Sequence, residues 1–474
     1  MLNPKIIANL HATSHIQDRY AAINTGNFHM KKDIKPIRYL LLLIFIGFQY
    51  GCSNFQNKPT LNYTKDKIEE IDQVVETLYE NGQFQGVVLV SVRGEIIYKK
   101  AVVYANVEDS IPITFDTKFR IASFTKPLTT MLILQLIEDR LIKLDDKLID
   151  YLPEFNIKGA ENITIRQLLT HTAGITGHPR IPNLLDIEKQ HYTRKEFLKL
   201  IMNYELIYNP GEGKEYSNFG YGLLGLVIEK VTGKSYDEVM NEKICQPAGM
   251  TNTLSDITEI PIENRAVGYT HYYFTGIGEA PFLDMSFCLG AGQLLSTAED
   301  LYLFDKALYS DKLLTKESKK LFFNDFGWLS TRYPYGKNSK RIFCNNLEGS
   351  INGFQSHTQR IEMDSVLIVA LRNIKEEVFE NQIAIKWPSS IASPIISILY
   401  NEDYEVTKMS GAFIVFKTLI ESDQNEAENK FVDISKQQDK YYLDKSEFEF
   451  FEEELRKKNM DIDADKFQSF IEKI

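Results

Sequence analysis

The stretch Phe119-Arg120-Ile121-Ala122-Ser123-Phe124-Thr125-Lys126 is the most informative part of this 474-residue chain. It leads into an apolar run at 127–139 that reads as a helix, with proline in the first turn, where it is tolerated. Ser123 and Lys126 are three residues apart, so on a helix they share a face and can share a hydrogen bond. A serine hydroxyl is a poor nucleophile until a base takes its proton, and a lysine whose pKa is lowered by burial can take it. The spacing therefore indicates an activated serine, although S-x-x-K alone is common by chance.

A second stretch, 210–221 (PGEGKEYSNFGY), has the Gly, Pro and Asn content of a loop and precedes an apolar helical run at 222–231. Tyr216 in this loop could exchange protons with the serine if it lay beside Lys126, because an ammonium group favours the phenolate. Asn218, two residues on, could offer its amide to a substrate carbonyl. Taken alone, the pattern is also typical of a tyrosine that only packs a turn.

Composition is that of a globular protein, with 43% hydrophobic and 25% charged residues. The net charge of −11 disfavours a nucleic-acid partner. Cys245, Cys288 and Cys344 show no CxxC spacing, so a zinc or redox site is not supported and we expect three small buried hydrophobes. No phosphate loop, carboxylate cluster or metal motif stands out. We therefore expect neither a metal nor a cofactor.

The N-terminal segment 1–52 reads as a targeting signal. An apolar run at 39–48 follows a basic stretch and is too short to span a bilayer comfortably. Cys52 follows at once, as in a bacterial lipoprotein signal, so we expect a lipid on Cys52 that attaches the protein to a membrane. Met30 is the more natural start, which would make 1–29 an extension. An uncleaved anchor is the alternative, and both interpretations predict an extracytoplasmic protein, periplasmic or on the outer membrane.

Strand patterns open and close the central part of the chain, 62–400. A helix at 64–81 precedes a predicted hairpin of 86–92 and 96–104, and two more strands are expected at 353–362 and 365–372. Helical signals fill 140–290. This order predicts an α/β (α+β) fold in which an antiparallel sheet is built from both ends of the unit, with a helical subdomain inserted. The acidic tail, 401–474, carries three predicted helices and reads as an appendage on the body or as a partner surface.

Five segments taken in order resemble the class C β-lactamase and penicillin-binding-protein family of serine hydrolases. They are 119–126, 163–174 (ITIRQLLTHTAG), 210–225, 249–253 (GMTNT) and 290–301 (GAGQLLSTAEDL), and the resemblance covers roughly residues 65–400. It implies the β-lactamase/transpeptidase fold, with a central antiparallel sheet flanked by helices and an all-helical subdomain. It also implies that Ser123 is acylated, that Lys126 and Tyr216 share the proton transfers, and that Asn218 holds the substrate amide.

The third motif of that family departs from its pattern here. Where Lys-Thr-Gly or His-x-Gly is expected, the chain has Leu347-Glu348-Gly349-Ser350. Gly349 still permits close backbone approach, and the N–H groups of Ser123 and Ser350 could form the oxyanion hole. The cation that would bind a substrate carboxylate is missing. This puts β-lactamase and carboxypeptidase activity in doubt and affects an esterase, or a peptidase acting on an uncharged end, less.

We therefore expect a serine hydrolase that forms an acyl-enzyme on an ester or amide, from a small molecule, a peptide or the cell wall. The alternative is an inactive penicillin-binding-like lipoprotein that binds or senses a ligand, which the loss of the cation at Leu347 motivates. His171 and His357 are further candidates for the chemistry, although a structural role is more typical of both. Arg120 is expected to form a salt bridge. The sequence does not set the oligomeric state.

Overall fold

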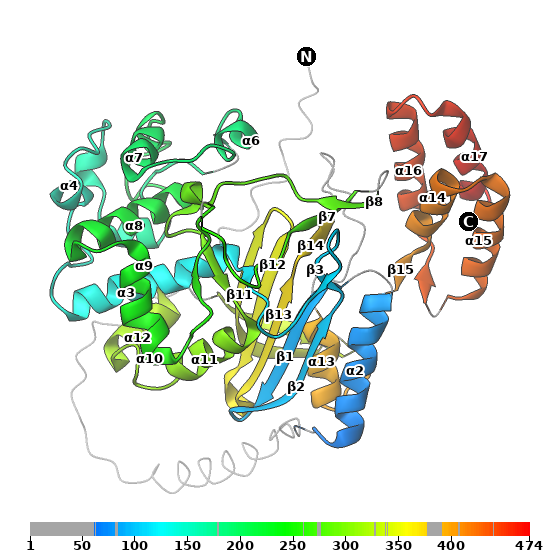
Figure 1. Ribbon diagram of the computed structural model, residues 1–474, viewed down its shortest axis with the longest axis horizontal. Helices are drawn as coiled ribbons and strands as arrows, with labels where there is room; N and C mark the ends of the chain where they lie inside the picture. Colours follow the sequence, from blue (N-terminus) through cyan, green and yellow to red (C-terminus); the bar gives the residue numbers. More distant parts are fainter. Residues whose placement is uncertain are drawn as a thin grey trace, which may run out of the picture. The chain divides into compact units, whose positions relative to one another are not determined.

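The computed structural model describes residues 61, 63–80, 84–177, 180–258, 260–272, 276–326, 329–336, 338, 340–376, 391–405, 408–438 and 440–474 (Figure 1). The predicted targeting segment 1–52, with Cys52 and the extension 1–29, lies outside these residues. The chain divides into two compact units, Met1–Pro59 and Thr60–Ile474, and the described residues all belong to the second. Within its described part, no helix combines the length and apolarity that a membrane span requires.

A six-stranded antiparallel sheet is the centre of this unit, in the order β10-β11-β12-β13-β1-β2. The strands are β1 (Gly86–Val92), β2 (Glu95–Val102), β10 (Leu329–Tyr335), β11 (Lys340–Ile351), β12 (Phe354–Ile361) and β13 (Val366–Arg372). The first two come from the start of the unit and the other four from its end, and β1 pairs directly with β13. This confirms the predicted sheet built from both ends. The sequence prediction did not include β10 and β11.

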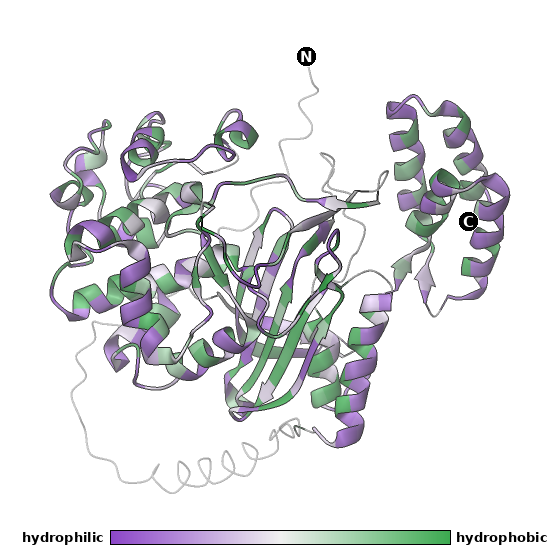
Figure 2. Cartoon of the chain, viewed as in Figure 1, coloured by the Kyte–Doolittle hydropathy of each residue, from purple (hydrophilic) through white to green (hydrophobic). Residues whose placement is uncertain are grey.

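Helices cover both faces of the sheet (Figure 1). α2 (Lys65–Glu80) and α13 (Ala392–Leu399) share one hydrophobic core with Val88 and Val90 of β1. Val87 and Leu89, which alternate with them, belong to the core on the other face, with α3 (Thr125–Glu138) and α11 (Ala298–Leu308). Successive side chains of a strand point to opposite faces, so a strand covered on both sides needs a continuous apolar run. The green colour of β1 in Figure 2 reflects this.

The helical middle of the unit is also confirmed. Its main helices are α4 (Leu148–Tyr151), α5 (Ile165–Leu169), α7 (Arg194–Met202), α8 (Asn218–Thr232), α9 (Tyr236–Met240), α10 (Gln246–Ala248) and α12 (Lys316–Asn324). Capping boxes begin several of them; in α5, for example, Thr164 accepts from the N–H of Gln167 and the Gln167 side chain accepts from the N–H of Thr164. The short strands β6 (Leu254–Ser255), β7 (Tyr269–Tyr272), β8 (Gly276–Glu279) and β9 (Leu294–Ser296) were not predicted.

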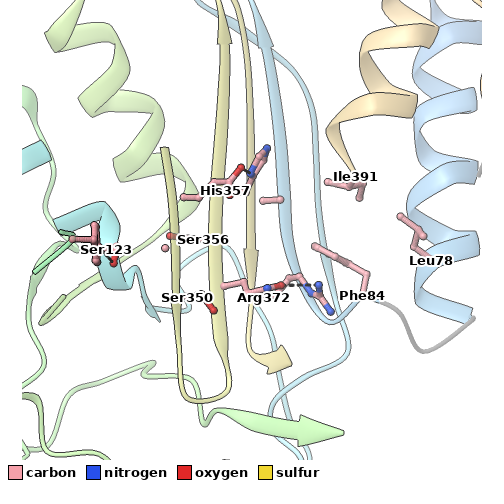
Figure 3. Close-up of a pocket in the computed structure, with 13 residues that line it drawn as sticks. Leu78, Phe84, Ser123, Ser350, Ser356, His357, Arg372 and Ile391 are labelled. Carbon is pink, nitrogen blue, oxygen red and sulfur yellow. Dashed lines mark hydrogen bonds and ion pairs between the residues drawn. The ribbon is translucent and has the colours of Figure 1, made fainter. Parts of the chain in front are cut away.

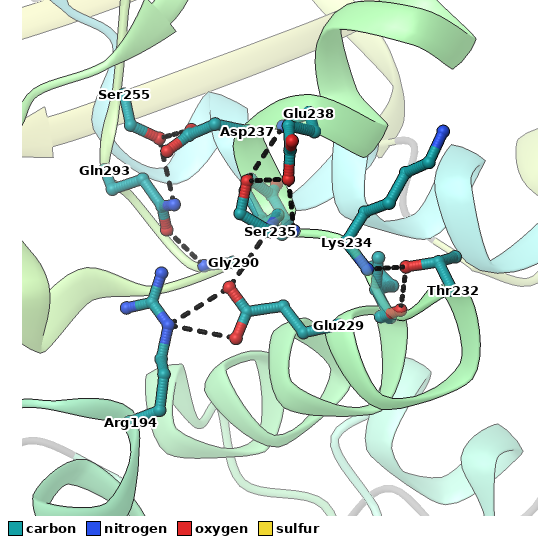
Figure 4. Close-up of polar contacts among 12 residues, drawn as sticks. Arg194, Glu229, Thr232, Lys234, Ser235, Asp237, Glu238, Ser255, Gly290 and Gln293 are labelled. Carbon is teal, nitrogen blue, oxygen red and sulfur yellow. Dashed lines mark hydrogen bonds and ion pairs between the residues drawn. The ribbon is translucent and has the colours of Figure 1, made fainter.

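A polar network ties α7, α8 and α9 to the loop that follows 289 (Figure 4). Glu229 of α8 accepts from Arg194 Nε at 3.0 Å and from the backbone N–H of Tyr236 at 3.0 Å. Gln293 donates to Ser255 Oγ at 3.0 Å and accepts from the N–H of Gly290. Gly290 has a φ of 64°, and a Cβ there would lie 2.6 Å from the carbonyl oxygen of Tyr221. The network and the glycine together fix the backbone of 290–293, which contacts the site described below.

The C-terminal residues form helices with a hydrophobic core of their own. The helices are α14 (Gly411–Glu421), α15 (Gln424–Lys436), α16 (Lys445–Lys457) and α17 (Asp461–Ile471). The first three match the predicted helices, whereas α17 was missed. Aromatic rings dominate this core; Phe416 stacks on Phe451 with ring centroids 4.5 Å apart. The aromatic residues of the tail thus serve packing, while the domain boundary at 401 stays a prediction.

Candidate active site

The segment around Ser123 enters the site from a short strand and is held on several sides. β5 (Phe119–Arg120) pairs with β9, and Arg120 Nε lies 2.6 Å from Asp256 Oδ2 in a buried ion pair, as the sequence predicted. Ser356 of β12 donates to the carbonyl of Ile121 at 2.8 Å. Ala122 then has a φ of 48°, in the left-handed region that non-glycine residues rarely adopt. This turn places Ser123 at the start of the helical segment formed by η1 (Ala122–Phe124) and α3.

Two side chains, those of Lys126 and Tyr216, contact the Ser123 hydroxyl. Lys126 Nζ donates to Ser123 Oγ at 3.0 Å, and Tyr216 OH lies 2.8 Å from the same oxygen. Lys126 is 5% exposed and also donates to the carbonyl of Ala291 at 2.9 Å. Burial lowers the pKa of Lys126 from its ordinary value, although the neighbouring Tyr216 opposes the shift. A buried amine with a lowered pKa, one hydrogen bond from a serine hydroxyl, can act as a general base.

Tyr216 reaches Ser123 from 93 residues further along the chain. It lies just before α8, whose N-cap Ser217 accepts from the N–H of Gly220 at 3.0 Å and donates to the carbonyl of Thr176 at 2.9 Å. Tyr216 itself is 52% exposed, so its ring forms an open side of the site. Lys126 Nζ lies 4.7 Å from the centre of that ring. Tyr216 can therefore contact both the serine and an incoming substrate.

The third motif lies within β11, directly against Ser123. A Cβ on Gly349 would lie 2.1 Å from the carbonyl oxygen of Ile121 and 2.9 Å from Ser123 N, so only glycine fits there. Leu347, two residues away on the same face, is 5% exposed and belongs to the core. Among the described residues the ladder between β10 and β11 ends at the Leu329–Asn346 pair, so 347–350 pairs with β12 on its other side only. Among the described residues, this length of β11 thus has one side without a strand partner, where an extended substrate could lie.

A cavity of about 320 Å³ connects these residues. Ser123, Tyr216, Gly349 and Ser350 line it, together with Glu348 on β11. Leu78, Phe84 and Ile391 form an apolar end beneath α2 and α13 (Figure 3). The cavity thus joins a polar end at Ser123 to an apolar end on the far side of the sheet.

Two charged side chains of this cavity were given no role from the sequence. The side chain of Glu348 is 60% exposed, and its Oε1 lies 3.2 Å from His357 Nδ1, a contact that lowers the pKa of Glu348. Arg372 of β13 was not singled out; it donates to Gln355 at 2.8 Å and is the cationic side chain that lines the cavity. The segments that carry the family resemblance all end by residue 350, so they gave no reason to single out Arg372.

Of the predicted site residues, the structure brings Ser123, Lys126, Tyr216, Gly349 and Ser350 together. Asn218 occupies the first position of α8, two residues beyond Tyr216, and is not among the described residues that line the cavity. The carbonyl of Ala291, which accepts from Lys126, was missed, although 290–301 was one of the segments that carried the resemblance. Backbone carbonyls leave no sequence signal. Cys245, Cys288 and Cys344 are free and buried, as expected.

Known proteins share this fold and sequence pattern. The family model described as Beta-lactamase matches residues 71–340. Penicillin-binding protein 4* of Bacillus subtilis (strain 168) is 28% identical over 369 residues, which cover 72% of this chain and 78% of that protein. Protein flp of Staphylococcus aureus (strain COL) is 30% identical over 329 residues, which cover 66% of this chain and 64% of that protein.

Among solved structures, D-amino acid amidase from Ochrobactrum anthropi SV3, complexed with L-phenylalanine amide, superimposes with a TM-score of 0.61 at 25% identity. The match covers 71% of this chain and 99% of the amidase. The fold is therefore that of the β-lactamase/transpeptidase group, as the sequence predicted. With the family match extending over more than half of its length, the chain belongs to the β-lactamase family, within the superfamily of serine hydrolases that includes penicillin-binding proteins and D-amino acid amidases.

Proposed function

We propose that this protein hydrolyses an ester or amide through an acyl-enzyme formed on Ser123. The observation that carries the proposal is the contact of both Lys126 Nζ and Tyr216 OH with Ser123 Oγ, at 3.0 and 2.8 Å. A serine nucleophile requires a base in contact with its hydroxyl, and Lys126 in its neutral form or Tyr216 can take that proton. Membership of a serine hydrolase superfamily supports the same reaction class.

In the first step the Ser123 hydroxyl loses its proton to the pair formed by Lys126 and Tyr216, and Oγ attacks the substrate carbonyl. The proton then passes to the leaving oxygen or nitrogen as its bond to the carbonyl carbon breaks. A water molecule, deprotonated by the same pair, attacks the acyl group and frees Ser123. Tyr216 is the exposed member of the pair and Lys126 the buried one, which favours delivery of the proton to the leaving group by Tyr216.

The negative charge that develops on the carbonyl oxygen needs donors already in place. We assign this role to the backbone N–H groups of Ser123 and Ser350. Gly349 is the reason that they can lie close together, because its missing side chain leaves room for the backbone at 121–123 to approach β11. Asn218 is proposed, from the family resemblance, to hold the substrate amide.

The substrate proposed is an ester or amide, peptide-like or derived from the cell wall. Leu347 is buried at the position where the family pattern has a cation. This argues against β-lactams and D-Ala-D-Ala ends as substrates, because their carboxylate would have to be bound at that position. Relatives whose names include an amidase support amide chemistry. The apolar end of the cavity, at Leu78, Phe84 and Ile391, suits an acyl group or side chain of low polarity.

The same Leu347 favours a second candidate function, a binding or sensing protein that keeps the fold without turnover. The contacts of Lys126 and Tyr216 with Ser123 weigh against it. We further propose that the protein acts outside the cytoplasm and is attached to the membrane through Cys52, and that residues 401–474 form an appendage to the catalytic unit. The proposals on the location, on the attachment through Cys52 and on residues 401–474 do not depend on the acyl transfer chemistry.

The test is labelling by a small fluorophosphonate, followed by intact-protein mass spectrometry, with Ser123→Ala as the matched control. One adduct on the wild-type protein and none on Ser123→Ala is the expected result, and ester turnover in the variant should fall below about 1%. Adducts on both proteins would refute the assignment of Ser123. Absence of an adduct on both, in a protein that binds but does not turn over esters, would favour the binding protein.

A further inference from the structure

We infer that His171 is a positioning residue that holds the Tyr216 loop so that the phenol reaches Ser123. The inference rests on the proposed function, because Tyr216 matters for catalysis only if Ser123 is the nucleophile. His171 lies in the segment after α5, 45 residues before Tyr216 in sequence by their numbers. Its contacts surround Tyr216 through both the ring and the backbone on either side.

The imidazole packs directly on Tyr216. Their ring centroids are 4.7 Å apart with an interplanar angle of 35°, and the His171 ring also lies 5.1 Å from that of the buried Tyr221. His171 therefore links the exposed Tyr216 ring to the core of the helical subdomain. A half-exposed tyrosine needs such a contact to keep one rotamer, because solvent offers its ring no support.

The backbone on both sides of Tyr216 is bonded to the same histidine. The N–H of Glu215 donates to the carbonyl of His171 at 2.9 Å, and the N–H of Ser217 donates to His171 Nδ1 at 3.1 Å. Tyr208, at the start of the loop, donates its hydroxyl to the same carbonyl at 3.2 Å. The residues before and after Tyr216 are thus fixed by one residue.

His171 adopts a left-handed conformation, with a φ of 60°. Non-glycine residues pay about 1 kcal/mol or more for this conformation, and histidine and asparagine are among those found there. This conformation lets the carbonyl of His171 accept from the N–H of Glu215 while its ring accepts from the N–H of Ser217. Gly177, further along the same segment, lies so close to Tyr216 that a Cβ there would be 2.6 Å from its carbonyl oxygen. The segment 171–177 therefore acts as a template for the Tyr216 loop.

The histidine cannot act as the base for Ser123 in this arrangement. Its Nδ1 accepts the Ser217 N–H, so the imidazole is neutral and carries its proton on Nε2. Burial, with Lys126 and Lys214 nearby, lowers the pKa of His171 to about 4, which keeps the ring neutral near pH 7. His171 thus acts through Tyr216 and not on the substrate.

Three variants separate the two contacts of the ring. His171→Ala removes both the acceptor and the aromatic contact. His171→Asn keeps an acceptor close to the position of Nδ1 and tolerates the left-handed backbone. His171→Phe keeps an aromatic ring without an acceptor. Thermal unfolding of each variant shows whether the fold persists.

The measured quantity is the rate of fluorophosphonate adduct formation on the full chain. We expect about a hundredfold decrease in His171→Ala, since misplacement of a reacting group by about 1 Å costs that much. His171→Asn should recover most of the rate. In a Tyr216→Phe background, His171→Ala should cause little additional loss, because both changes remove the same contribution. A wild-type rate in His171→Ala, or losses that add fully in the double variant, would overturn the inference.

Two further measurements separate this inference from the proposed function. They use the wild-type protein, so their outcome does not depend on whether a variant folds. In wild-type protein with ¹⁵N-labelled histidine, the nitrogen shifts of His171 should show a neutral ring with its proton on Nε2 at pH 7, and the Ser217 amide should exchange slowly. A charged ring, or a proton on Nδ1, would contradict the inference even if Ser123 is acylated. If Ser123 is not labelled, the proposed function fails, while these measurements still decide whether His171 fixes the loop.

Discussion

The Ser123 side of the site and the β11 side are held by different means. Around Ser123 the polar groups are buried and bonded more than once: Lys126 bonds Ser123 and Ala291, and Arg120 pairs with Asp256 in the interior. On β11, the side chain of Glu348 is 60% exposed, and 347–350 is bonded to a strand on the β12 side alone among the described residues. The Ser123 side is therefore the rigid side, and it carries the nucleophile with its partner Lys126. The β11 side is the open side, and it carries the departure at Leu347 next to Gly349 and Ser350, which serve the proposed oxyanion hole. We infer that the rigid side fixes the nucleophile and that substrate choice depends on the open side.

The largest effect on stability is expected from the rigid side. Arg120→Ala leaves the carboxylate of Asp256 buried with Arg265 as its remaining cationic partner among the described residues, whose Nη2 is 2.9 Å away. Removal of one partner of a buried pair costs about 3–5 kcal/mol, and Arg265 should keep the loss near the lower value. Urea unfolding of the full chain measures it.

The matched control is Arg166→Ala, which removes an ion pair to Asp145 whose side chains are 44% and 76% exposed. Exposed pairs contribute at most about 1 kcal/mol. Equal losses of unfolding free energy in the two variants would show that the Ser123 side is no more rigid than the surface.

The next largest effect is expected where the two sides touch, at Gly349. A methyl group there would collide with the carbonyl of Ile121 and crowd Ser123 N, so Gly349→Ala must push β11 away. We expect a loss of about 1–3 kcal/mol in unfolding free energy and a fall of about a hundredfold in the rate of Ser123 labelling. Ser350→Ala keeps the backbone N–H assigned to the oxyanion hole and should stay close to wild type. Similar losses in both variants would mean that the Ser350 side chain, and not its backbone, does the work.

The pH dependence of labelling tests the Lys126 environment. The neutral amine is the form that accepts a proton, so the rate should rise with pH and level off near the pKa of Lys126. Because burial lowers that pKa, the plateau should be reached below 10.5. Rates from pH 5 to 11 locate it, and Tyr216→Phe shows whether the rise belongs to the lysine. A rise that continues to pH 10.5 or above would contradict a desolvated amine.

Local spacing explains what the sequence could predict. Ser123 and Lys126 share a face because they are three apart on one helix, and the apolar run of β1 requires burial on both sides. The role of Tyr216 beside Ser123 was predicted from the family resemblance, because its own segment does not show that it meets a serine 93 residues away. α17 was missed although its acidic first turn is typical of a helix start, because its buried phenylalanines find their partners only once α14 and α16 are present.

The parts that could not be predicted depend on tertiary contacts of the backbone. The left-handed turns at Ala122 and His171 are not marked by a glycine, so no pattern in the sequence reveals them. The carbonyl of Ala291 becomes a partner of Lys126 only when the loop at 290–293 is folded against α3. β11 was overlooked because its alternation is broken: 344–347 is buried without interruption, with polar Asn345 and Asn346 among the buried residues. Asn345 is held by Tyr309 and Glu362, which lie elsewhere in the chain.

The smallest effect is expected on the open side, at Glu348. Glu348→Gln weakens a half-exposed pair with His357, so the unfolding free energy should change by less than about 1 kcal/mol. The pKa of Glu348 is lowered by His357, so its contribution to the unfolding free energy is present above the unfolded pKa of about 4.5 and disappears as the pH falls through the lowered value.

The effect of Glu348→Gln on substrate choice should be clearer than its effect on stability. A unit charge about 4 Å away is worth about 1–4 kcal/mol in water or at a protein surface. Loss of the carboxylate should therefore shift the ratio of kcat/KM for a cationic over an anionic ester at least about fivefold toward the anionic one at low salt. Glu95→Gln on β2, at the opposite edge of the sheet, should leave the ratio unchanged. A ratio that stays constant in Glu348→Gln would show that β11 does not select substrate charge, and that the open side differs from the Ser123 side in exposure alone.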